Sequence, residues 1–87
     1  MIRTLIVDDS AFMRMAIRSM LASSPEIKIV GDARDGKEAA EKAKILQPDI
    51  IIMDVNMPVM DGLEAVKTIM SSDPVPIIMF STLTTEG

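Results

Sequence analysis

Three acidic residues and one serine stand where they could carry out phosphoryl chemistry together. Asp8 and Asp9 are adjacent and follow one apolar run, while Asp54 and Ser81 each follow another. Carboxylates that share a cleft repel one another and raise each other's pKa unless a cation neutralises them. Mg²⁺ suits such a site, because it prefers oxygen ligands and keeps waters that a phosphoryl oxygen can replace. With the ion in place, a carboxylate could act as a nucleophile and form an acyl phosphate, whose oxygens the Ser81 hydroxyl could then hydrogen-bond.

The elements that must position these side chains are short apolar runs that alternate with amphipathic stretches. The predicted strands are residues 5–7, 27–31, 50–53 and 77–80. The acidic pair at 8–9 follows the first strand, Asp54 follows the third, and Ser81 follows the fourth. The second strand alternates apolar and polar residues, which is typical of a half-exposed edge strand.

Three helices are predicted between these strands. Ser10 can cap the first, which runs to about Leu21. Asp35 and Asp61 are each followed three residues later by a glutamate, so we interpret both as helix caps in capping boxes and not as site residues. The residues expected to face the core are Phe12, Met15, Ala16, Ile17 and Met20 in the first helix, Ala39, Ala40, Ala43 and Leu46 in the second, and Leu63, Val66, Ile69 and Met70 in the third. The side chains expected on solvated helix faces are Arg14, Arg18, Lys37, Lys42 and Lys44.

The order of elements predicts an α/β fold. A β-α-β-α-β-α-β pattern with almost continuous apolar strands is typical of a doubly wound parallel sheet with helices on both faces. Right-handed crossovers bring the carboxyl ends of all strands to one edge, where such sheets bind ligands. The acidic residues are therefore expected to converge there. Taken alone, Asp8 and Asp9 could also be only a polar lead-in to a helix.

Composition excludes several other classes of function. The net charge of −4 argues against nucleic acid as a partner. The chain has no cysteine and no histidine, which excludes disulfides, thiolate chemistry and a serine–histidine triad within it. The longest strictly apolar runs have four residues, far fewer than a membrane span needs. We expect a single cytoplasmic domain.

Residues 7–10, 53–62 and 80–81 together resemble a two-component response-regulator receiver domain over the whole chain. The resemblance implies a flavodoxin-like sheet, and it implies that a sensor histidine kinase phosphorylates Asp54. It further implies that Asp9 ligates Mg²⁺ directly, that Asp8 acts largely through water, and that the backbone carbonyl of Asn56 is another ligand beside Asp54. Ser81 would be the switch hydroxyl, for which Thr82 is the competing candidate.

Residues 8–14, 58–65 and 81–87 are similar to the receiver of chemotaxis protein-glutamate methylesterases. That resemblance implies a C-terminal effector domain, a methylesterase, in the parent protein, while this chain itself is not an enzyme. Receivers also carry a lysine after a fifth strand, and Lys67, on a predicted helix, is no substitute. We therefore expect residues 1–87 to be a receiver truncated at its C-terminus, with four strands and three helices.

Three rival functions are considered. A flavodoxin-like cofactor binder needs a hydroxyl- or glycine-rich phosphate loop after its first strand, where Asp8 and Asp9 would repel phosphate. A haloacid-dehalogenase-type phosphatase needs Asp-x-Asp after the first strand, whereas here residues 54–56 read Asp-Val-Asn after the third. The third rival is a non-signalling fragment that folds as a homodimer or oligomer through its exposed fourth strand, since unpaired apolar edges invite pairing.

Overall fold

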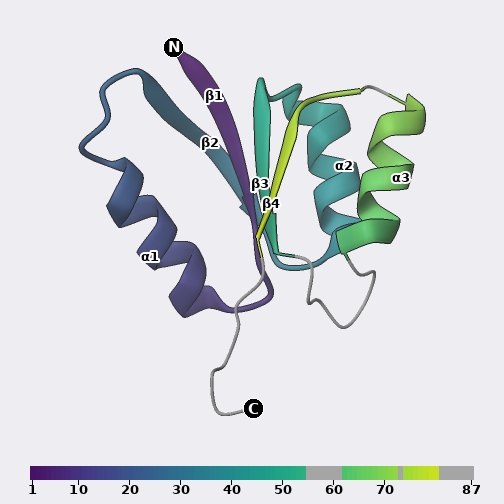
Figure 1. The fold of residues 1–87 in the computed structure, drawn as a ribbon, viewed down its shortest axis with the longest axis horizontal. Helices are drawn as coiled ribbons and strands as arrows, with labels where there is room; N and C mark the ends of the chain where they lie inside the picture. Colours follow the sequence, from purple (N-terminus) through teal and green to yellow (C-terminus); the bar gives the residue numbers. More distant parts are fainter. Residues whose placement is uncertain (55–61, 73, 81–87) are drawn as a thin grey trace.

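The protein is described by a computed structural model that covers residues 1–54, 62–72 and 74–80 (Figure 1). The elements are β1 (Ile2–Val7), α1 (Ala11–Leu21), β2 (Ile27–Ala33), α2 (Gly36–Leu46), β3 (Ile50–Asp54), α3 (Gly62–Ser72) and β4 (Ile77–Phe80). The strands form one parallel sheet in the order β2-β1-β3-β4. Helix α1 covers one face, and α2 and α3 lie side by side on the other. The predicted doubly wound α/β fold is confirmed, and residues 1–54, 62–72 and 74–80 contain the four strands and three helices expected.

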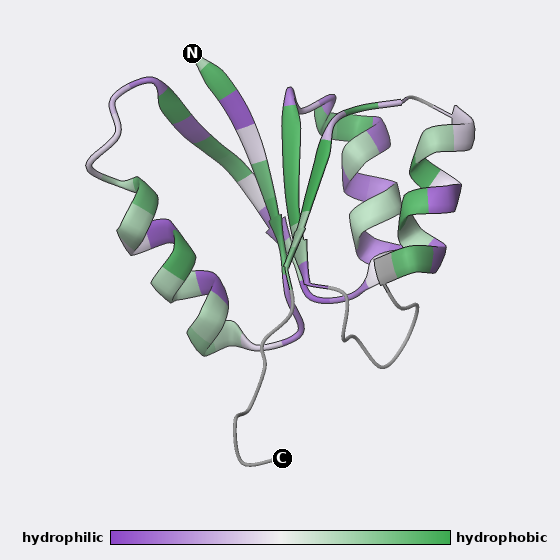
Figure 2. Ribbon diagram, viewed as in Figure 1, coloured by the Kyte–Doolittle hydropathy of each residue, from purple (hydrophilic) through white to green (hydrophobic). Residues whose placement is uncertain are grey.

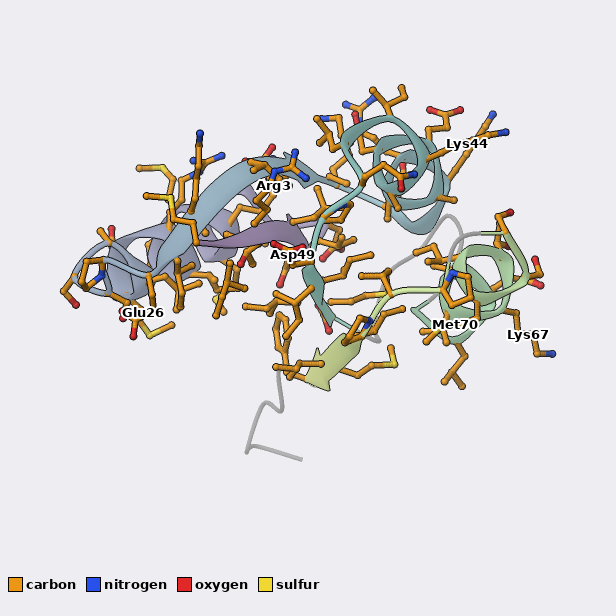
Figure 3. All side chains as sticks on the ribbon, turned by 90° about the horizontal axis from the view of Figure 1, so that it is seen from above. Arg3, Glu26, Lys44, Asp49, Lys67 and Met70 are labelled. Carbon is orange, nitrogen blue, oxygen red and sulfur yellow. The ribbon has the colours of Figure 1, made fainter. Side chains whose placement is uncertain are left out.

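The register of the two central strands is fixed at their amino ends. The Arg3 N–H donates to Asp49 Oδ2 at 2.8 Å, and the Asp49 N–H donates to the Arg3 carbonyl at 2.7 Å. The Arg3 guanidinium also reaches the Gln47 carbonyl, and Figure 3 shows Arg3 and Asp49 close together at this end of the sheet. From this start Val7 of β1 pairs with Met53 of β3 at the opposite end. The residues that follow each strand are therefore neighbours.

The core lies mainly between the sheet and the α2–α3 pair. Leu5, Val7, Ile51 and Met53 point to this side and are fully buried. The helices meet them with Ala39, Ala43, Ala65 and Ile69, small side chains apart from the isoleucine, so the helices can approach the sheet closely. Figure 2 shows the strands as hydrophobic over most of their length, whereas the helices alternate.

The opposite face of the sheet is less completely covered. Between α1 and the β3–β4 strands lies an apolar groove of about 270 Å³, lined by Met13, Ile17, Met20, Leu21, Ile52, Ile78 and Phe80. Ile78 is 54% exposed, on a strand at the edge of the sheet as far as the structure describes it.

The predicted buried face of α1 is partly wrong. Ile17 is buried, but Phe12, Met15 and Met20 are 78%, 68% and 67% exposed. Apolar residues lie on several sides of this helix, so their spacing does not select one face. The side that meets the sheet carries Ile17 together with two arginines: Arg14 donates to the Asp8 carbonyl and Arg18 to the Asp32 carboxylate.

The other predicted helix faces were more successful. In α2, Ala39 and Ala43 are buried and Ala40 and Leu46 pack against the core, as expected. In α3, Ile69 is buried and Val66 packs against the core, but Leu63 and Met70 are exposed because Ala65 faces the sheet instead.

The predicted cap of α2 is confirmed with one difference. The Glu38 N–H donates to Asp35 Oδ1 at 2.8 Å, but the Glu38 carboxylate accepts from the Arg34 N–H and not from that of the cap residue. Ser10 caps α1 as predicted, while Asp61 lies outside the described residues. In the part of the chain that the structure describes, no helix combines the length and apolar character needed to cross a membrane.

Candidate metal centre

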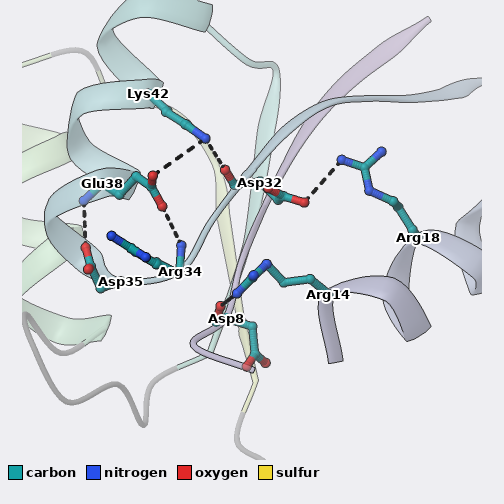
Figure 4. Close-up of polar contacts among 8 residues, drawn as sticks. All are labelled: Asp8, Arg14, Arg18, Asp32, Arg34, Asp35, Glu38 and Lys42. Atoms are coloured by element: carbon teal, nitrogen blue, oxygen red, sulfur yellow. Dashed lines mark hydrogen bonds and ion pairs between the residues drawn. The ribbon is translucent and has the colours of Figure 1, made fainter. Parts of the chain in front are cut away.

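The turn between β1 and α1 holds Asp8 and Asp9 at the carboxyl edge of the sheet. Three hydrogen bonds fix Asp8: its N–H donates to the Ala33 carbonyl at 3.0 Å, its Oδ1 accepts from the Ser10 N–H at 2.8 Å, and its carbonyl accepts from Arg14 Nη1 at 2.7 Å (Figure 4). The Ser10 hydroxyl then accepts the Met13 N–H at 3.2 Å, which starts the helix. The turn is therefore tied to β2 on one side and to α1 on the other.

Asp54 reaches the same place from β3. Because Val7 pairs with Met53, the next residue of each strand, Asp8 and Asp54, stand side by side. One ligand oxygen from each of Asp8, Asp9 and Asp54 lies within 4.8 Å of the others. Asp8 and Asp54 are 1% and 2% exposed, whereas Asp9 is exposed. The three form a site with a buried floor and one carboxylate at its mouth, so the predicted convergence is confirmed.

The three carboxylates of this cluster repel one another. Burial raises the pKa of Asp8, the Ser10 N–H that donates to its carboxylate opposes the rise, and the charges of Asp54 and Asp9 add to it. Among the described residues, Asp8 Oδ2 is buried without a hydrogen-bond partner. A carboxylate oxygen only accepts, so two ionised neighbours cannot satisfy each other, whereas a proton shared with Asp9 or a cation would satisfy both.

These observations fit a divalent cation. Three convergent carboxylates are hard oxygen ligands, of the kind that Mg²⁺ and Ca²⁺ prefer over soft metals. An ion at the mouth could bind the exposed Asp9 directly and neutralise the two buried groups. The orphaned Asp8 oxygen would then gain a partner, either the ion or a water bound to it.

The remaining predicted site residues lie partly beyond what the structure describes. Asn56, Ser81 and Thr82 are outside the described residues. Lys67 is exposed on α3, and Figure 3 shows it directed away from the sheet, in agreement with the expectation that it takes no part in the site.

The sequence reasoning missed Arg14, which was expected on a solvated face but donates to the Asp8 carbonyl. Arg18 and Lys42, expected to be solvated too, also make contacts at the end of β2: Arg18 pairs with the Asp32 carboxylate, and Lys42 donates to the Asp32 carbonyl. One signal could have identified Arg14. Helical side chains lean toward the helix N-terminus, so an arginine in the first turns can reach the loop that precedes the helix.

Comparison with known proteins agrees with this fold. Residues 4–86 match the sequence profile of the response regulator receiver domain, and the chain therefore belongs to that family. This membership sets aside the flavodoxin-like and haloacid-dehalogenase-type interpretations.

Within the family the similarity is to chemotaxis methylesterases. The chain is 86% identical over 87 residues to the protein-glutamate methylesterase/protein-glutamine glutaminase 1 of Methanosarcina mazei. The alignment covers 100% of this chain and 24% of that protein. The crystal structure of the response regulator domain of Thermotoga maritima CheB is 55% identical with a TM-score of 0.90, over 99% of this chain and 64% of that one. A chain of the CheX–CheY–BeF₃–Mg²⁺ complex from Borrelia burgdorferi is 36% identical with a TM-score of 0.83, over 98% of this chain and 65% of that one.

The chain thus spans about a quarter of its methylesterase relative, and the matched part is the receiver region. The prediction that these 87 residues are a receiver domain is confirmed.

Proposed function

We propose that this chain is the phospho-acceptor receiver of a chemotaxis-type two-component system, in which Asp54 takes a phosphoryl group from a sensor histidine kinase with the help of Mg²⁺. The observation that carries the proposal is the cluster of Asp8, Asp9 and Asp54, whose ligand oxygens lie within 4.8 Å of one another at the carboxyl edge of the sheet. Family membership supports the same reading.

Each residue has a distinct task in this proposal. Asp9, at the mouth, ligates the ion directly; Asp8, buried below it, acts largely through a bound water; Asp54 and the Asn56 carbonyl complete the protein ligands. Mg²⁺, when bound, neutralises the carboxylates and holds a phosphoryl oxygen of the donor.

Asp54 is the nucleophile, because it stands on a central strand and its carboxylate is part of the cluster. One of its oxygens attacks phosphorus, a new oxygen–phosphorus bond forms, and the nitrogen–phosphorus bond to the kinase histidine breaks. The departing imidazole takes a proton from solvent. The Ser81 hydroxyl then donates to the phosphoryl group and reports the phosphorylated state.

The wider setting follows from the methylesterase relative. We place the domain in the cytoplasm, with the kinase as its partner and a C-terminal methylesterase as the effector that phosphorylation switches. Neither nucleic acid nor a membrane is needed for this function.

A second candidate is favoured by one observation. The apolar groove beside β4, with Ile78 more than half exposed at the sheet edge, is a surface that another polypeptide could cover. We propose as the alternative that residues 1–87, as an isolated polypeptide, do not signal but assemble as a homodimer or oligomer through β4.

Mg²⁺ titration followed by NMR or calorimetry tests the metal half of the principal proposal. Asp9→Ala should abolish binding, because it removes the direct ligand, and Asp8→Ala should weaken it. Asp32→Asn, which removes one carboxylate at the end of β2 outside the cluster, is the control and should bind as the wild type does. Equal binding by the wild type and Asp9→Ala would refute the assignment. Transfer of one phosphoryl group to Asp54 from acetyl phosphate, read by intact mass, tests the other half.

A further inference from the structure

Arg14 is bound to the turn that carries the candidate ligands and not to any of their carboxylates. Its Nη1 donates to the Asp8 carbonyl at 2.7 Å from a half-buried position on α1 (Figure 4). We infer that Arg14 is a positioning residue, which fixes the backbone between Asp8 and Ser10 and so sets the place of the Asp9 carboxylate in the metal centre. This inference rests on the proposed function.

The hydrogen bonds around the turn show how one arginine can do this. Asp8 is anchored to β2 through its N–H, and the Ser10 N–H that donates to its Oδ1 closes a turn around the Asp8–Asp9 peptide, but neither bond engages the Asp8 carbonyl. The Arg14 bond holds that carbonyl, and with it the peptide plane that leads into Asp9. Asp9 itself is exposed, so little packing restrains it. The direction of its side chain therefore depends on the backbone that Arg14 holds.

Arg14 also differs from the basic groups that lie near the end of β2. Arg18 lies 3.2 Å from the Asp32 carboxylate, and Lys42 lies 3.8 Å from that of Glu38. Arg14, by contrast, donates to a backbone carbonyl, that of Asp8. An arginine that acted only through its charge would compete with Mg²⁺ at an acidic cluster. The hydrogen bond from Arg14 to a backbone carbonyl instead fits a role in fixing the position of the turn.

A role through charge and a role in positioning predict opposite changes in Mg²⁺ affinity when Arg14 is replaced, so the two roles can be told apart. Removal of a nearby positive charge should tighten the binding of a cation, since repulsion falls. Loss of a residue that orients a ligand should weaken it, typically by tenfold or more. Arg18→Met removes the same charge one turn further along α1 without touching the turn, and it is the matched control for Arg14→Met.

The experiment is Mg²⁺ titration of the 87-residue chain by calorimetry, for the wild type, Arg14→Met, Arg14→Lys and Arg18→Met. We expect Arg14→Met to weaken binding by roughly tenfold, Arg14→Lys to restore part of it because lysine still donates to the carbonyl, and Arg18→Met to bind as tightly as the wild type or slightly more tightly. The rate of phosphorylation by acetyl phosphate should fall in Arg14→Met at low Mg²⁺ and recover at saturating Mg²⁺.

Thermal unfolding without Mg²⁺ checks that each variant folds, and Arg14→Leu, which also lacks a hydrogen-bond donor, replaces Arg14→Met if the latter does not. Arg14→Lys binding no better than the donor-free variant, or the donor-free variant binding as tightly as Arg18→Met, would overturn the positioning role while leaving the proposed function intact. Failure of the wild type to bind Mg²⁺ at all would overturn both.

Discussion

Replacement of Asp8 by asparagine should stabilise the chain in the absence of metal. Asp8 is 1% exposed, its Oδ2 has no hydrogen-bond partner among the described residues, and it shares a 4.8 Å cluster with Asp9 and Asp54. Asparagine has the same shape, and its Oδ1 can still accept the Ser10 N–H. Its amide N–H₂ can donate to a neighbouring carboxylate, so a repulsive contact becomes an attractive one.

The magnitude follows from two contributions. Two unit charges 4.8 Å apart repel by about 3.5 kcal/mol at an effective dielectric constant of about 20, and solvent screens the share that comes from the exposed Asp9. A buried acceptor without a partner costs about 1–3 kcal/mol. Because these two contributions overlap and the asparagine amide must itself be desolvated, we expect a net gain of about 1–3 kcal/mol in the free energy of unfolding near neutral pH, or about 4–8 °C in Tm per kcal/mol.

Urea unfolding followed by circular dichroism, with EDTA and then with Mg²⁺, measures this. With EDTA the variant should unfold at the higher urea concentration. With Mg²⁺ at ten times its Kd, the wild type should gain about 1.4 kcal/mol and the variant less, because it lacks one carboxylate. A variant less stable than the wild type in EDTA would refute the reasoning, since it would mean that the fold already compensates the Asp8 charge.

Three further predictions concern pH, packing and assembly. The folded state raises the pKa of Asp8 above 3.8, so the contribution of Asp8 to stability without metal is present at low pH and is lost as pH rises through the raised value. Urea midpoints should show this loss in the wild type and not in Asp8→Asn. The affinity for Mg²⁺ should rise over the same range of pH, because the ligand must be deprotonated. Ile17→Ala should lower the free energy of unfolding by about 2–4 kcal/mol, whereas Phe12→Ala should change it by less than about 0.5 kcal/mol; similar losses would restore the face predicted from sequence. The isolated chain should associate at micromolar concentration by light scattering, and Ile78→Lys should shift it toward monomer; a wild type that stays a compact monomer with cooperative melting would contradict this.

The fold and the centre of the site were predictable because they depend on strong local signals. Apolar runs that end in acidic residues place Asp8 and Asp54 at one edge of any parallel sheet, and the Ser10 and Asp35 caps follow from short spacings. The side of α1 that is buried was not predictable. Its apolar residues surround the helix, and the contacts on the side that faces the sheet, from Arg14 to Asp8 and from Arg18 to Asp32, join separate elements.

The same limit explains α3 and the Arg14 contact. Leu63 and Met70 are larger and more apolar than Ala65, yet Ala65 is the residue that is fully buried. Close packing of helix on sheet favoured the small side chain, and this choice depends on the distance between two layers, which helical periodicity does not encode. Contacts between a side chain and a distant backbone carbonyl leave no periodic signal either.

The central claim is that Asp54 accepts a phosphoryl group at a Mg²⁺ site, and intact-mass spectrometry after incubation with acetyl phosphate tests it most directly. The account predicts a gain of one phosphoryl group in the wild type with Mg²⁺, a much smaller gain with EDTA, and none in Asp54→Asn. Asp32→Asn, which removes a carboxylate outside the cluster, should label as the wild type does. Labelling that persists in Asp54→Asn would contradict the account and would move the acceptor to another residue, of which Asp9 is the nearest exposed carboxylate in the cluster.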